Sequence, residues 1–160
     1  MTTTTHQTTI DVLDDMPAIR ITREFDAPPA NVFRAHTDPE LVVRWLGPRD
    51  LTMTVDRLDC RSGGEYRYLH RREGEEYGFR GSFHEVRPDE LIVQTFTFEG
   101  APDGVALEKM TFEDLGDGRT RLVGLSICDS FEDRDAMVAS GMETGIVQGY
   151  ERLDDVLAAG

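Results

Sequence analysis

Apolar and polar residues alternate along Ala18–Phe25, and the same period of two residues returns between Leu51 and Cys128. This alternation predicts β-strands with one buried face. Short segments rich in Gly, Pro and Asp separate the later strands, so neighbouring strands should pair as antiparallel hairpins. The strands expected in the second region are Leu51–Leu58, Tyr66–Arg72, Tyr77–Val86, Leu91–Phe98, Val105–Leu115 and Thr120–Cys128.

Apolar residues at helical spacing occur in three places. One short helix is predicted from about Ala30 to His36. A second should begin after Asp38-Pro39, because Asp is a good N-cap and Pro fits the first helical turn. From Asp133 to about Ala158 the helical spacing continues without a gap, which predicts one long helix.

The order of elements is therefore strand, two short helices, six strands and a long helix. A twisted, mostly antiparallel sheet of seven strands has one face to bury, and the long helix is the element able to cover it. We expect an α+β protein with one domain over residues 18–158 and a flexible arm over residues 1–17.

Charge narrows the range of partners. The chain of 160 residues has 17 basic and 31 acidic side chains, a net charge of −14, and no basic cluster. Nucleic acids and anionic membrane surfaces bind basic faces, so neither is expected as a partner. The first residues lack the basic start and apolar stretch of a signal peptide, which favours a cytoplasmic location.

No cofactor or metal is expected. The four histidines and two cysteines show no metal-binding spacing, and no nucleotide-binding or nucleophile motif is present. Tyr66, Tyr68 and His70 share one face of their strand and are weak candidates for an acid–base group. The alternative is packing, with the tyrosine hydroxyls satisfied by neighbouring groups.

One face of the predicted sheet is unusually aromatic, and Gly141, Gly145 and Gly149 recur on one face of the predicted long helix. Each glycine destabilises a helix interior by about 0.5–1 kcal/mol relative to Ala, so the three need an explanation. One explanation is close approach of the helix to the sheet, and the other is empty space that a ligand fills. The second predicts a binding pocket enclosed by Trp45, Tyr66, Tyr68, Phe79, Phe83, Phe96, Met110, Phe112, Met142, Ile146 and Tyr150.

Several short motifs follow one another along almost all of residues 18–158. They include Phe25-Asp26-Ala27-Pro28, Arg44-Trp45-Leu46-Gly47-Pro48, Gly63-Gly64-Glu65-Tyr66 and Gly141-Met142-Glu143. In this order they resemble START-like (SRPBCC) proteins of the branch related to the activator of heat-shock-protein ATPase. The resemblance implies a helix-grip fold, in which a curved sheet wraps around the C-terminal helix and leaves a deep cavity between them.

Relatives in this superfamily include lipid and hormone carriers, aromatic polyketide cyclases and a domain of a chaperone co-factor. The first function expected here is binding of a small hydrophobic or aromatic molecule, in a carrier, sensor or stress-related role. The alternatives are a cyclase-like acid–base enzyme using Tyr66, Tyr68 or His70, and a chaperone helper or other protein-interaction domain. A homodimer is compatible with all three, since START-like relatives often pair.

Overall fold

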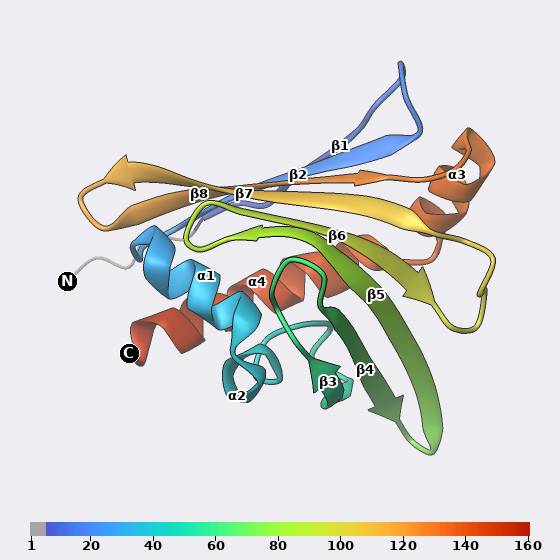
Figure 1. Cartoon of the computed structure of the whole chain (residues 1–160), viewed down its shortest axis with the longest axis horizontal. Helices are drawn as coiled ribbons and strands as arrows, with labels where there is room; N and C mark the ends of the chain where they lie inside the picture. The colour runs from blue at the N-terminus through green and yellow to red at the C-terminus, as the bar shows by residue number, and fades with distance from the viewer. Residues whose placement is uncertain (1–5) are drawn as a thin grey trace.

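One curved antiparallel sheet of eight strands forms the body of the protein (Figure 1). The computed structural model describes residues 6–160, so the start of the arm expected from the sequence lies outside the described residues. The strand order is β1-β2-β8-β7-β6-β5-β4-β3, with the edges at β1 and β3. The strands are β1 (Thr9–Val12), β2 (Ala18–Phe25), β3 (Thr52–Leu58), β4 (Glu65–Arg72), β5 (Glu75–Arg87), β6 (Leu91–Phe98), β7 (Ala106–Gly116) and β8 (Arg119–Ile127).

The expectation of seven strands is wrong by one. Strand β1 falls within the segment predicted as a flexible arm and pairs with β2, placing Thr9 opposite Thr22 and Val12 opposite Ile19. Most of β1 is exposed at the sheet edge, so its four residues carry little of the alternation that marks a half-buried strand. The domain limits at residues 18–158 stay a prediction.

Two short helices connect β2 to β3, as the sequence predicts. Helix α1 spans Pro29–Thr37 and α2 spans Pro39–Val42. The Asp38 side chain accepts a hydrogen bond from the Glu40 backbone N–H at 2.9 Å, which caps α2.

The long helix predicted from Asp133 to Ala158 is interrupted, and that prediction is wrong in this respect. Helix α3 spans Phe131–Ala139 and α4 spans Met142–Ala158. Between them Gly141 has φ +87°, a left-handed conformation that favours glycine. None of the helices in residues 6–160 combines the length and the apolar character needed to cross a membrane.

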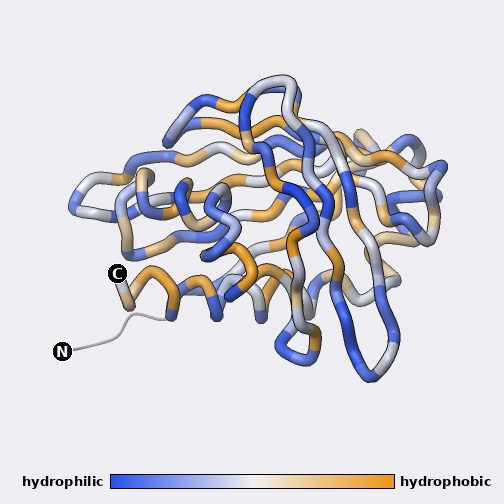
Figure 2. Tube along the Cα trace, turned by 60° about the horizontal axis from the view of Figure 1, so that its bottom comes forward, coloured by the Kyte–Doolittle hydropathy of each residue, from blue (hydrophilic) through white to orange (hydrophobic). Residues whose placement is uncertain are grey.

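The part of the core that lies away from the cavity is built around the second half of α4. Helix α4 runs along the concave side of the sheet, with α1 beside its C-terminal half and α3 at the opposite end (Figure 1). Leu153 of α4 packs with Phe25, Val32 and Leu122, all fully or almost fully buried. The hydropathy of α4 alternates along the helix, and the tip of the β4–β5 hairpin is hydrophilic (Figure 2). The second half of α4 therefore belongs to the packed core, whereas its first half faces the cavity described next.

Candidate ligand-binding cavity

A cavity of about 930 Å³ lies between the concave face of the sheet and the first half of α4. Side chains from β3 to β8 form most of its wall, and Met142 and Ile146 of α4 form the side opposite the sheet. Some of the lining residues, such as Ala101 in the β6–β7 loop and Ser140 before α4, are exposed. The cavity is therefore open to solvent.

Nearly all of the wall predicted from the sequence lies on this cavity. The residues brought together are Trp45, Tyr66, Tyr68, Phe79, Phe83, Phe96, Met110, Met142, Ile146 and Tyr150. Phe112 does not line it: its ring packs edge-on against Phe33 and His36, each with a centroid distance of 5.4 Å. Phe112 lies further along β7, where α1 fills the space above the sheet.

The aromatic rings form a continuous wall over three neighbouring strands. Tyr66 and Tyr68 of β4 stack at 6.1 Å, Tyr68 and Phe79 at 5.2 Å, and Phe79 and Phe96 at 5.5 Å. On the opposite side, Tyr150 of α4 stacks with Trp45 at 6.0 Å. Because each ring packs against its neighbours, these side chains form a continuous, preformed aromatic surface.

The three glycines predicted on one helix face have different roles. A Cβ at Gly149 would lie 3.1 Å from the Trp45 carbonyl oxygen, so close approach of the helix explains this glycine. A Cβ at Gly145 would make only an ordinary 3.4 Å contact with Pro48. Gly141 provides the left-handed turn before α4, and all three border the cavity. Close approach therefore explains Gly149 and the left-handed turn explains Gly141, whereas empty space filled by a ligand stays a prediction for Gly145.

A row of three polar side chains crosses the cavity wall. Gln94 of β6 lies opposite Glu108 of β7, and Glu108 lies opposite Ser126 of β8. The Gln94 Nε2 donates to Glu108 Oε1 at 3.0 Å, and the Ser126 hydroxyl lies 3.4 Å from Glu108 Oε2. Burial raises the pKa of the Glu108 carboxyl, although the two hydrogen bonds act in the other direction.

This polar row was not predicted from the sequence, although the sequence contains a signal for it. Glu108 is in phase with Met110 and Phe112 along β7, and Gln94 is in phase with Ile92 and Phe96 along β6. A polar residue in phase with an apolar face is unusual, because alternation should place it on the solvent side. Such a residue marks a polar group directed into the interior.

The weak catalytic candidates Tyr66, Tyr68 and His70 all lie on the cavity wall. The Tyr66 hydroxyl donates to the Thr95 carbonyl oxygen at 2.6 Å. Burial, together with the negative charge of Glu108, raises the pKa of both tyrosines. Burial lowers the pKa of His70, whose Nε2 is buried without a hydrogen-bond partner in residues 6–160. Both tyrosines are therefore protonated and His70 is neutral near pH 7.

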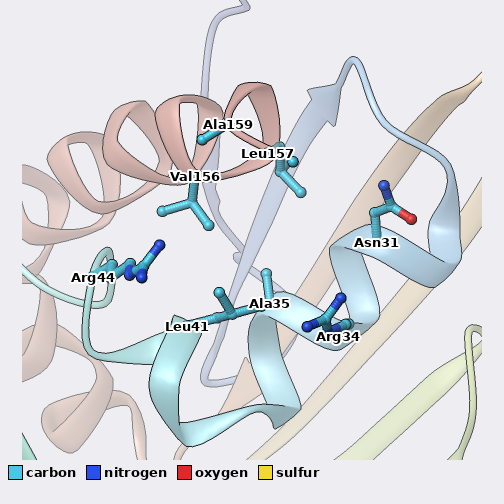
Figure 3. A pocket seen from close by; sticks show the side chains of 9 residues that line it. Asn31, Arg34, Ala35, Leu41, Arg44, Val156, Leu157 and Ala159 are labelled. Atoms are coloured by element: carbon cyan, nitrogen blue, oxygen red, sulfur yellow. The ribbon is translucent and has the colours of Figure 1, made fainter.

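A second, smaller pocket of about 150 Å³ lies between α1, α2 and the end of α4 (Figure 3). Leu41 and Val156 line it, and Arg34 and Arg44 also border it. Arg34 lies 3.7 Å from the carboxylate of Asp38. This pocket contains none of the predicted wall residues. Within residues 6–160, no group of three or more His, Cys, Asp or Glu side chains is arranged to hold a metal ion.

A curved antiparallel sheet around a C-terminal helix, with a cavity between them, defines the START-like (SRPBCC) class with the helix-grip fold. The family model described as "Activator of Hsp90 ATPase homolog 1-like protein" matches residues 26–158, and the chain belongs to this family. No curated protein shows a significant match.

Several solved structures share the fold over nearly the whole chain. Protein Ms6760 from Mycobacterium smegmatis is 25% identical, with a TM-score of 0.86 and coverage of 96% of this chain and 99% of that chain. A protein from Rhodobacter sphaeroides is 26% identical, with a TM-score of 0.88 and coverage of 96% and 100%. Protein CV1439 from Chromobacterium violaceum is 28% identical, with a TM-score of 0.75 and coverage of 88% and 96%.

Proposed function

We propose that the protein binds a small, largely apolar molecule in the cavity between the sheet and α4, as a carrier or sensor. The observation that carries this proposal is a cavity of about 930 Å³ walled by stacked aromatic rings and crossed by one polar row. Binding sites for small molecules typically enclose about 300–1,000 Å³ and combine apolar walls with a few polar groups.

The character of the cavity wall supports the same proposal. Its aromatic and aliphatic side chains border a space that is open to solvent, so an apolar molecule that covers them removes apolar surface from water.

An acid–base enzyme that uses Tyr66, Tyr68 or His70 has less support. The Tyr66 hydroxyl is already hydrogen-bonded to a backbone carbonyl, and a raised pKa makes both tyrosines poorer acids near neutral pH. Family membership leaves the choice open because one fold hosts several functions.

The test is native mass spectrometry of the protein purified from its own source, compared with the variant Gly124→Leu. Gly124 lies on the cavity wall, and a Cβ added there would meet only the Ile21 carbonyl oxygen, at 3.9 Å. A leucine at this position should enter the cavity without a backbone clash. We expect an apolar compound bound in a one-to-one ratio to the wild-type protein and absent from Gly124→Leu.

Val123→Leu is the matched control, because Val123 is the neighbouring residue on the same strand and its side chain is on the other face of the sheet. It should keep the compound. If the purified wild-type protein is empty and also fails to bind a panel of fatty acids and naphthalene derivatives in calorimetry, the ligand-binding proposal is wrong. That result would favour the protein-interaction role.

A further inference from the structure

Within residues 6–160, the Glu108 carboxyl on the cavity wall has no positively charged hydrogen-bond partner. Its hydrogen-bond donors are the amide of Gln94 and the hydroxyl of Ser126, both uncharged. Among the described residues, no basic side chain contributes to its pKa. A buried carboxylate without a cation is unfavourable, so this position lacks the group that would balance it.

The basic residues around the cavity do not fill this role. Arg57 forms an ion pair with Glu65, with 2.7 Å between Nη1 and Oε1, and Arg72 pairs with Asp50. Lys109 follows Glu108 in the strand, so the alternation of β7 directs its side chain to the opposite face. None of these three basic side chains therefore pairs with the Glu108 carboxyl.

Aromatic residues line the same cavity as this carboxyl group, and the Tyr66 hydroxyl lies 3.4 Å from Gln94 Nε2, the group that donates to Glu108. The negative charge of Glu108 contributes to the raised pKa values of Tyr66 and Tyr68 on β4 and of Tyr150 on α4. These three tyrosines therefore lie near the carboxyl from two sides of the cavity. A carboxylate in a cavity walled by aromatic rings is a combination that holds an ammonium group, through an ion pair and cation–π contacts.

We infer that the ligand carries a protonated amine that pairs with Glu108, and that its apolar body lies against the aromatic wall. This inference rests on the proposed ligand-binding function and names the chemical class of the ligand. A fatty acid or other anion would instead meet the Glu108 carboxyl as a like charge. The net charge of −14 also favours the approach of a cation over that of an anion.

Two matched probes test the inference in isothermal titration calorimetry at pH 7. These are 2-naphthylmethylamine, which is a cation, and 2-naphthylmethanol, which has the same shape and no charge. Wild-type protein should bind the amine about tenfold more tightly or better, the range expected for a charge-assisted pair. Glu108→Gln should lose this preference and bind the two probes with similar affinity.

Glu113→Gln is the matched control. Glu113 lies on the same strand, is exposed and faces the opposite side of the sheet, so the variant has the same change in net charge. It should keep the wild-type preference for the amine. A circular dichroism spectrum and a thermal unfolding midpoint like those of Glu113→Gln show that Glu108→Gln is folded.

Proton release provides a second readout. Burial raises the pKa of the Glu108 carboxyl, and pairing with an ammonium group favours its charged form, so binding of the amine should shift this pKa down; calorimetry in buffers of different ionisation enthalpy counts the protons released by that shift. The negative charge of Glu108 also raises the pKa values of four other groups, which are Tyr66, Tyr68, Tyr150 and Cys128. They stay protonated near neutral pH, so the released proton comes from Glu108, and Glu108→Gln should release none.

The outcomes separate the two proposals. If wild-type protein binds the alcohol as tightly as the amine, or if Glu108→Gln still prefers the amine, the inference about the ligand is wrong and the ligand-binding function stands. If wild-type protein binds neither probe and none of the wider apolar panel, both proposals are wrong.

Discussion

At the scale of single residues, His36 is a histidine that the fold keeps neutral. Its Nδ1–H donates to the Val32 carbonyl oxygen at 2.8 Å, and its Nε2 is buried without a partner in residues 6–160. Its ring packs edge-on against Trp45, with 4.7 Å between centroids. Burial lowers the pKa of His36 to about 4.

Because of this shift, the free energy of unfolding should decrease in mild acid. In the unfolded chain a histidine has a pKa near 6.5, so between about pH 6.5 and 4 the unfolded state binds more protons. The stabilisation is complete above this window and declines as the pH falls. Between pH 7 and 5, protonation of His36 should lower the free energy of unfolding of the wild type by about 2 kcal/mol. The variant His36→Phe lacks this group, so its free energy of unfolding should not show this part of the decrease.

Urea unfolding at the two pH values measures this difference. His70, with its lowered pKa, and Glu108, with its raised pKa, act in both proteins and cancel in the comparison. Equal losses in the two proteins would show that His36 does not titrate in this range.

A second residue-scale prediction concerns Arg23, which is 2% exposed. Its guanidinium donates to both carboxylate oxygens of Asp154, at 2.8 and 2.6 Å, and joins β2 to α4. Asp154→Ala would leave a buried cation unpaired, so the free energy of unfolding should fall by about 3 kcal/mol. Asp155→Ala, one residue further along and exposed, should have little effect in the same chemical denaturation measurement. Equal effects of the two variants would argue against a structural role for the pair.

The residues of the site were only partly predictable from the sequence. Alternation alone assigns Tyr66, Tyr68 and Phe79 to one face, because the side-chain period of a strand is two residues. It does not give the register between strands, which places Gln94, Glu108 and Ser126 side by side. Their meeting depends on pairings between segments far apart in the chain, and no local pattern contains that information.

At the scale of elements, helix α4 contains two glycines in different surroundings. Gly145 has room for a Cβ, so Gly145→Ala should raise the free energy of unfolding by about 0.5–1 kcal/mol through helix propensity. At Gly149 a side chain would meet the Trp45 carbonyl and the backbone of Gly47, within 3.1 to 3.5 Å. Gly149→Leu should therefore destabilise the protein. Thermal unfolding of the two variants checks the opposite signs, and a stabilised Gly149→Leu would contradict close approach of the helix.

The elements themselves were well predicted where turns are explicit. The segments around Gly74 and Gly118 end one strand and begin the next, and both hairpins form as expected. The break before α4 was missed because the apolar spacing continues through Ser140 and Gly141, and only the left-handed φ of Gly141 reveals it. Strand β1 was missed because an exposed edge strand of four residues has almost no apolar face to detect.

At the scale of the whole molecule, one end is packed and the other is hollow. The core formed by α1, the end of α4 and the adjoining strands supplies contacts that do not depend on a ligand. The first half of α4, with the aromatic strands opposite, surrounds the cavity. Because a ligand that binds only the folded state adds to its stability, occupancy of this cavity is coupled to the stability of the whole fold.

The position of Trp45 gives this cavity a built-in optical reporter. Trp45 is the one tryptophan in the chain, it is 3% exposed, and it lies on the cavity wall. Its indole N–H donates to the Ala35 carbonyl oxygen at 2.9 Å, which fixes the ring while its surroundings change. Entry of a ligand would therefore alter the intrinsic fluorescence of one known residue, so filling and emptying of the cavity can be followed in real time without a label.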